Sequence, residues 1–140
     1  MNDCVFCRIV AGEIPALKVY EDETLVAFLD ITPVNLGHTL IVPREHYENL
    51  LATPDAVLAA MANAVKKVAK AAMAVEDAPA FNLGVNTGPA AGQVVMHTHF
   101  HVMPRLPDDG LEHWPKREVT PEQMEGAVAR MRAALAENAA

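Results

Sequence analysis

The stretch that decides the fold of this 140-residue chain reads His97-Thr98-His99-Phe100-His101-Val102. Histidine alternates with other residues, and alternate side chains of a β-strand point to opposite faces of the sheet. The pattern therefore predicts a strand over residues 94–103, with the three histidines on one face and Phe100 and Val102 in the core. Half of the chain's 6 histidines fall in this stretch, which indicates a chemical site rather than a solvated strand face.

Three histidines in a row on one strand could serve a metal or a nucleophile. Ligands at positions i, i+2 and i+4 of a straight strand span about 13 Å. Zn–N bonds are only about 2.0–2.1 Å long, so a single ion would hold all three with difficulty. We therefore expect the histidines to divide their roles.

Working outward from the triad, short strands are predicted at residues 18–20, 25–29, 39–42 and 81–85. A short helix is predicted at 44–51 and a long one at 53–75, where Thr53 suits the N-cap and Pro54 the first helical position. A final helix begins at Thr120, which forms a capping-box pattern with Gln123. Because only the long helix separates strands, we predict an α+β fold with a largely antiparallel sheet.

Composition limits what the chain can be. Its length predicts one domain, residues 1–140. The net charge of −7 leaves no basic surface for nucleic acid, and no apolar run is long enough to span a membrane. The first residues lack the pattern of a signal peptide, so we expect a cytoplasmic protein.

Cys4 and Cys7 form a CxxC pair, which is half of a zinc site. His46 and His97 could complete a closed Cys2His2 site, and a closed site would be structural. Two alternatives stay open at this stage. A redox pair usually follows a strand in a βαβ unit, and no strand precedes Cys4; the two thiols could also be unliganded.

With His97 at the metal, His99 is left for chemistry. A neutral imidazole can attack as a nucleophile and form a covalent intermediate. Just upstream, Gly88 and Gly92 would let backbone N–H groups approach an anion, and Gln93 carries further amide donors. This arrangement favours a phosphate held against His99.

The sequence resembles the histidine triad (HIT) family, whose pattern is His-φ-His-φ-His-φ-φ with φ apolar; only Thr98 departs from it. The resemblance runs from about residue 4 to residue 105. It includes Phe6–Val10, Ala27-Phe28-Leu29-Asp30-Ile31-Thr32-Pro33, residues 37–46, Asn86-Thr87-Gly88 and Gly92-Gln93. It implies a HIT domain with a core of about residues 4–105 and an extension at about 106–140. Its fold would be a five-stranded antiparallel sheet with one long helix and a C-terminal helix.

The resemblance also implies roles for single residues. His99 would attack the α-phosphorus of a nucleotide, His101 would contact the α-phosphate, and the carbonyl of His97 would orient His99. Asp30 would hold the ribose. The rest of the nucleotide site would consist of Phe28 and Ile31 near the base, Asn86, Gly92 and Gln93 at the phosphate, and His38 and Val94 close by.

Within the family the chain is similar to the bacterial zinc-containing, Hint-like branch, which implies zinc on Cys4, Cys7, His46 and His97, no organic cofactor, and a homodimer. Relatives of this branch often carry serine where this chain has Val94, a change that bears on turnover. Trp114 resembles a tryptophan that in relatives can reach the partner's site.

These features and the resemblance together predict a nucleotide-binding hydrolase or transferase that acts through a nucleotidyl-His99 intermediate. It would cleave the P–N or P–O bond at the α-phosphorus of a purine nucleoside phosphoramidate or a related nucleotide, with adenosine as the first choice. Two alternatives remain. One is a dinucleoside polyphosphate hydrolase, and the other is a nucleotide-binding regulatory module with little turnover.

Overall fold

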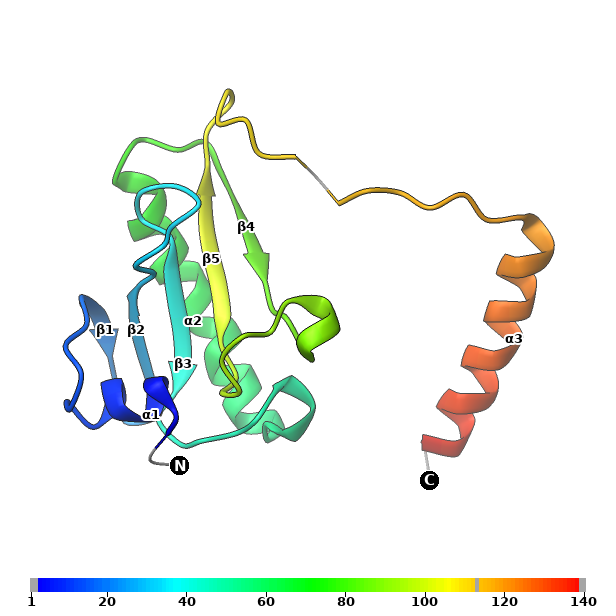
Figure 1. Cartoon of the computed structure of the whole chain (residues 1–140), viewed down its shortest axis with the longest axis horizontal. Helices are drawn as coiled ribbons and strands as arrows, with labels where there is room; N and C mark the ends of the chain where they lie inside the picture. The colour runs from blue at the N-terminus through cyan, green and yellow to red at the C-terminus, as the bar shows by residue number, and fades with distance from the viewer. Residues whose placement is uncertain (1–2, 113, 139–140) are drawn as a thin grey trace. The chain divides into compact units, whose positions relative to one another are not determined.

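The computed structural model describes residues 3–112 and 114–138, which belong to two compact units, Met1–Asp109 and Gly110–Ala140. The first unit carries all the described strands (Figure 1). Its elements are α1 (Val5–Val10), β1 (Lys18–Glu21), β2 (Leu25–Leu29), β3 (Thr39–Pro43), the 3-10 turn η1 (Leu50–Ala52), α2 (Asp55–Ala74), β4 (Ala80–Gly84), the 3-10 turn η2 (Pro89–Ala91) and β5 (Phe100–Arg105).

The five strands form one sheet in the order β1-β2-β3-β5-β4. Every neighbouring pair is antiparallel. The predicted α+β class and the five-stranded antiparallel sheet are confirmed. Because β5 lies between β3 and β4, the triad segment enters the sheet near its middle.

Both faces of β2 and β3 are covered, which explains why these strands read as continuous apolar runs. On one face Leu25, Ala27 and Ile41 pack with α2. On the other face Val26, Phe28, Leu40 and Val42 pack with Phe6 and Ile9 of α1. Figure 1 shows the long α2 behind the sheet and the short α1 in front of it. The site described below lies on the α1 face.

The helix α2 forms as predicted but begins one residue later. Pro54 is the N-cap and Asp55 the first helical residue, and no side chain caps the helix. The hydroxyl of Thr53 instead donates to the carbonyl of Asn49 at 2.8 Å and lies 2.7 Å from the hydroxyl of Thr98. Thr53 therefore ties the start of α2 to the triad segment.

Two elements differ from the prediction. The strand predicted at 94–103 begins only at Phe100. The N–H of Thr98 donates to the carbonyl of Tyr47 at 2.8 Å, and this bond holds the backbone before Phe100 out of the sheet. The three histidines therefore do not share a straight strand, although Phe100 and Val102 do lie in the α2-facing core. The helix predicted at 44–51 is wrong. Only η1 is helical there, with Asn49 as its cap.

The second unit contains α3 (Pro121–Asn138). The predicted capping box is present: the Thr120 N–H donates to Gln123 Oε1 at 2.8 Å, and the Gln123 N–H donates to Thr120 Oγ1 at 3.1 Å. Across the described part of the chain, no helix combines the length and apolar character that crossing a bilayer requires.

Candidate functional site

His97 is the residue at which two sites meet. Its side chain is fully buried, and its Nδ1 lies 3.4 Å from Cys4 Sγ and 3.5 Å from Cys7 Sγ. Its backbone carbonyl accepts a 2.7 Å hydrogen bond from His99 Nδ1. One residue thus faces the cysteines with its ring and His99 with its carbonyl. This is made possible by the irregular backbone before β5.

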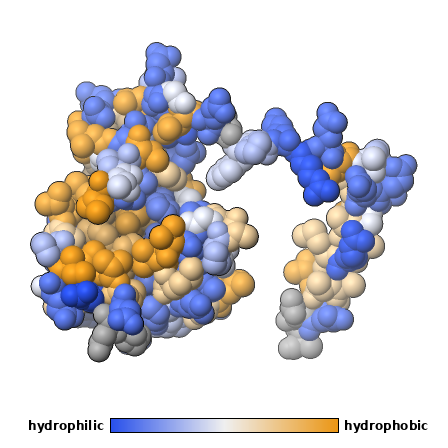
Figure 2. All heavy atoms as spheres, viewed as in Figure 1, coloured by the Kyte–Doolittle hydropathy of each residue, from blue (hydrophilic) through white to orange (hydrophobic). Residues whose placement is uncertain are grey.

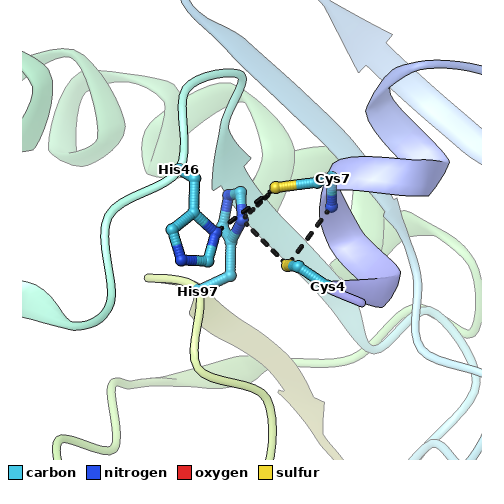
Figure 3. A group of neighbouring side chains, drawn as sticks. All are labelled: Cys4, Cys7, His46 and His97. Carbon is cyan, nitrogen blue, oxygen red and sulfur yellow. Dashed lines mark hydrogen bonds between the residues drawn. The ribbon is translucent and has the colours of Figure 1, made fainter. Parts of the chain in front are cut away.

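The first site is the cluster of Cys4, Cys7, His46 and His97, whose sulfur and nitrogen atoms lie within 4.8 Å of one another. The rings and sulfur atoms converge on a common point (Figure 3). Cys4 caps α1, Cys7 lies on its first turn, and His46 follows β3. His46 Nδ1 is 3.3 Å from Cys7 Sγ.

This cluster fits a tetrahedral zinc ion. Zn–S bonds of about 2.3 Å and Zn–N bonds of about 2.0–2.1 Å separate sulfur from nitrogen by about 3.6 Å in a tetrahedron. The observed separations are 3.3–3.5 Å. His97 Nε2–H donates to the carbonyl of Pro43 at 2.9 Å, which leaves the Nδ1 lone pair facing the sulfurs. A carbonyl partner of this kind is typical of metal-bound histidine.

The two thiols lie among four donors that can surround one ion. Burial, followed by the hydrogen bond and the charge of Cys4, raises the pKa of the Cys7 thiol to about 11. Of the alternatives left open by the sequence, the donor set favours the metal site.

The second site contains His99 at the wall of a pocket. Because a carbonyl only accepts, His99 carries its proton on Nδ1, and its Nε2 keeps a lone pair. The His99 side chain is 7% exposed, and burial lowers the pKa of its imidazole, an effect opposed by the hydrogen bond to His97 and by Asp30. His99 is therefore neutral near neutral pH, as a nucleophile must be.

The pocket lies between α1, the ends of β2 and β5, and the loop before β5. Its wall brings together many of the residues singled out from the sequence, namely Phe28, Asp30, Ile31, Asn86, Gly92, Val94, His99 and His101. Hydrophobic residues gather on the face of the first unit that carries α1 (Figure 2). Ile31 and Val94 are 92% and 87% exposed, so both stand at the pocket's rim.

One part of the wall was not singled out as site-forming from the sequence. Phe6 packs edge-on against His99, with ring centroids 5.0 Å apart, and edge-on against Phe28 at 5.4 Å. Ile9 and Ile14 continue the apolar wall. The i, i+3 spacing of Phe6 and Ile9 behind the cysteine cap is the signal that could have indicated a helix with one apolar face.

Two predicted residues act at a distance from the pocket. His38 is 4% exposed and is not among the described residues that line the pocket. The side-chain amide of Gln93 donates to the carbonyls of Glu48 and Val95, and its Oε1 accepts from the Gly88 N–H. Gln93 thus shapes the loop rather than offering its amide to a ligand.

His101 lies beside His99, with ring centroids 5.0 Å apart. Its Nδ1 is 2.9 Å from His38 Nε2, which in turn is 3.5 Å from Asp30 Oδ2. Burial, and then the charges of His99 and His38, lower the pKa of His101 to about 4. The pocket therefore presents neutral imidazoles beside a single carboxylate.

Known proteins resemble this chain in sequence and in fold. The HIT domain model matches residues 11–108, and the chain belongs to the HIT family. Its Cys/His cluster supports a place in the zinc-containing branch. A Zn-bound histidine triad family protein from Mycobacterium smegmatis has 38% identity and a TM-score of 0.75 over 95% of this chain and 98% of that one.

Two curated relatives carry named activities. Adenylylsulfatase HINT3 of Arabidopsis thaliana is 48% identical over 110 residues, which cover 79% of this chain and 56% of the relative. This chain thus matches little more than half the length of that protein. Adenosine 5'-monophosphoramidase hnt1 of Schizosaccharomyces pombe is 39% identical over 123 residues, or 86% of this chain and 90% of the relative.

Proposed function

We propose that this protein hydrolyses purine nucleoside phosphoramidates, adenosine phosphoramidate first among them, through a covalent nucleotidyl-His99 intermediate. The observation that carries the proposal is the hydrogen bond from His99 Nδ1–H to the carbonyl of His97. It leaves the Nε2 lone pair of a neutral ring on the pocket side. The named activities of two relatives, a monophosphoramidase and an adenylylsulfatase, both concern adenosine nucleotides.

The chemistry runs in two displacements at phosphorus. The Nε2 lone pair of His99 attacks the α-phosphorus, the P–N bond breaks, and the amine leaves with a proton taken up from solvent. The positive charge on the nucleotidylated ring is stabilised by the Nδ1–H bond to His97. Water then attacks the same phosphorus, the bond to His99 breaks, a proton is released, and the nucleoside monophosphate departs.

The pocket provides matching contacts for the rest of the nucleotide. Phe28, Ile31 and Phe6 offer an apolar wall for a base. Asp30 offers Oδ2 to ribose hydroxyls, since its Oδ1 already accepts from the backbone and hydroxyl of Thr32. The apolar wall and the single carboxylate suit a nucleoside with one phosphate.

The charge of the pocket disfavours a dinucleoside polyphosphate as substrate. Among the described residues that line the pocket, none is lysine or arginine. A polyphosphate leaving group carries several negative charges, which enzymes that transfer phosphoryl groups neutralise with such side chains or with metal ions. An amine leaving group requires no such compensation.

We also propose that Cys4, Cys7, His46 and His97 hold one structural zinc ion, with no organic cofactor. Four protein ligands close the coordination sphere, so the ion would contribute folding energy rather than an activated water. Within the chain the effect would be to fix α1, with Phe6, against His99.

A second copy of the chain is the partner we propose. The strand β4 stands at the edge of the sheet, where its outer backbone groups could pair with another strand. Phe81 and Leu83 of this strand are 38% and 46% exposed. Sedimentation at micromolar concentration tests this: we expect a dimer, and a monomer would contradict it.

The function is tested by AMP release from adenosine phosphoramidate, with wild-type and His99→Ala protein assayed side by side. We expect release by the wild type only. Release of AMP from diadenosine tetraphosphate alone would favour the polyphosphate hydrolase. Tight AMP binding without turnover of either substrate would favour a regulatory module and would direct attention to Val94.

A further inference from the structure

The loop that joins β2 to β3 carries pocket residues but is mostly exposed. Asp30, Ile31 and Thr32 line the pocket from this loop, and most side chains of residues 31–36 are exposed. At the base of the loop, the N–H of Asp30 donates to the carbonyl of His38 at 2.9 Å. A segment with so little buried surface opens easily unless polar contacts hold its outer part.

One side chain supplies such contacts to the outer part of the loop. The amide of Asn35 uses both of its hydrogens, since Nδ2 donates to the carbonyl of Pro104 at 2.9 Å and to Asp109 Oδ2 at 3.1 Å. Both partners are acceptors, so this is the orientation of the amide that satisfies them. Within the described part of the chain, no other hydrogen bond joins residues 31–36 to an element outside the loop.

Asn35 therefore fixes the loop to the end of β5, beside which the loop lies in Figure 1. The bond to Asp109 matters because that carboxylate is itself held in place. Arg105 binds it twice, through Nε to Oδ2 at 2.8 Å and through a terminal nitrogen to Oδ1 at 3.0 Å. The Leu106 N–H adds a third bond at 3.1 Å. A two-bond pair fixes angle as well as distance, and the Asp109 side chain is only 5% exposed.

We propose that Asn35 and Asp109 are positioning residues, which hold the β2–β3 loop so that the Asp30 carboxylate meets the ribose hydroxyls of a nucleotide. The ribose contact itself rests on the proposed function. Asp30 Oδ1 accepts from the backbone N–H and the hydroxyl of Thr32, so the direction of the carboxylate depends on the path of the loop. An acceptor fixed before binding costs less to order when the ligand arrives.

A simpler role for the same bonds is a clasp that closes the end of β5 and adds only stability. The two roles differ in the ligands that they affect. A clasp would leave the folded protein equally able to bind nucleotides with and without ribose hydroxyls. A positioning role affects only the ligands that have these hydroxyls.

The test is calorimetric binding of AMP and of dideoxy-AMP, which lacks both ribose hydroxyls, to the zinc-bound, full-length protein. We expect the wild type to bind AMP at least about tenfold more tightly, because hydrogen bonds to a charged group are strong. Asn35→Leu has similar volume and no donor. It should reduce this preference to less than about threefold and leave the Kd of dideoxy-AMP within about twofold of wild type.

A second set of variants checks that the effect passes through Asp30. Asp30→Ala should also abolish the preference for AMP, and adding Asn35→Leu to it should change the preference no further. Asp109→Asn removes the charge that binds Asn35 and should act like Asn35→Leu. Asp108→Asn, at the exposed neighbouring position, is the matched control and should keep the wild-type preference.

Equal weakening of both ligands by Asn35→Leu, or additive effects in the double variant, would overturn the positioning role. A wild type that binds the two ligands equally would overturn it as well. Thermal melting shows whether each variant is folded, and if Asn35→Leu is not, Asp109→Asn decides. Binding is measured without turnover, so a wild type that releases no AMP from adenosine phosphoramidate would contradict the proposed function, while the preference for AMP still decides the role of Asn35.

Discussion

The cysteine cluster and the pocket each hold imidazoles a few ångströms apart, yet they prepare those rings for different work. In the cluster, His97 gives its Nε2–H to Pro43 and turns its Nδ1 lone pair to the sulfurs of Cys4 and Cys7. In the pocket, His99 gives its Nδ1–H to a carbonyl and keeps the lone pair of its Nε2.

The two regions differ in the ring nitrogen that bonds to a backbone carbonyl, which is Nε2 in His97 and Nδ1 in His99. They also differ in their surroundings, which are other ligand atoms in the cluster and a pocket beside His99. The cluster has four donors converging on one point, which suits a closed structural ion. The pocket leaves its free nitrogen next to an opening lined by apolar side chains. If this comparison is right, changes in the pocket should affect turnover, and changes in the cluster should affect stability.

The largest expected effect is on turnover. His99→Ala should lower kcat for adenosine phosphoramidate by at least about 10³-fold, because the nucleophile is removed. AMP binding, measured by calorimetry, and the melting temperature should change little. Loss of stability comparable to the loss of turnover would contradict the division of roles.

The second effect is on stability. Cys7→Ser, or removal of metal by a chelator, should lower Tm by about 10 °C or more, because a structural ion contributes folding energy. Ala11→Ser, at the exposed end of the same helix, is the matched control and should melt like wild type. After Cys7→Ser, a chelator should have no further effect. A metal-free wild type with unchanged Tm would exclude the cluster as a stabilising site.

A smaller effect concerns the threonine between His97 and His99. Thr98 is buried, and because the Thr53 hydroxyl donates to the carbonyl of Asn49, the Thr98 hydroxyl donates to Thr53 Oγ1 at 2.7 Å. Thr98→Val should cost about 1–3 kcal/mol in unfolding free energy by leaving buried polar groups unpaired. Urea unfolding measures this, and a double-mutant cycle with Thr53→Val should show coupling between the two hydroxyls. Additive effects would contradict the contact.

The last effect is a dependence of stability on pH. The pKa of His101 falls from its ordinary value of 6.5 to about 4 in the folded protein. Between these values the unfolded chain binds the proton and the folded chain does not, so the unfolding free energy should decline as the pH falls from 6.5 to 4. The groups that face His101 are His99, His38 and Asp30.

His101→Gln, which cannot titrate, isolates this contribution. Urea unfolding of both proteins at several pH values between 7 and 5 should show a shallower decline for the variant, whereas acid release of metal from the cluster would affect both alike. If the unfolding free energy declined with pH equally in both proteins, the titration of His101 would not be its cause.

Much of the fold followed from the sequence because alternation and capping are local signals. The strands at residues 25–29 and 39–42 and the helix of 53–75 were predicted within a residue or two. The strand of the triad was predicted too early. The alternating pattern continues into residues 94–99, where contacts with Tyr47 and Thr53, distant in the sequence, draw the backbone out of the sheet.

Of the two sites, the cysteine cluster was the more predictable. A CxxC pair needs only two further ligands to complete a zinc site, and the sequence pointed to His46 and His97, which the structure places beside the cysteines. The path of residues 44–49 was not predicted. Arg44, which follows β3, donates its backbone N–H to the carbonyl of Thr24 and its Nε–H to the carbonyl of Asp22, so no helix begins there. The directions of the bonds around His38, His99 and His101 depend on backbone groups from three different segments, and no local pattern encodes them.

The most direct test of the central claim is the mass of the peptide that contains residue 99, taken from protein mixed with adenosine phosphoramidate and quenched at alkaline pH within milliseconds. The account predicts one nucleotidyl group on His99 in the wild type and none in His99→Ala. Rapid AMP release by the wild type with an adduct on His97 or His101, or undiminished release by His99→Ala, would contradict it.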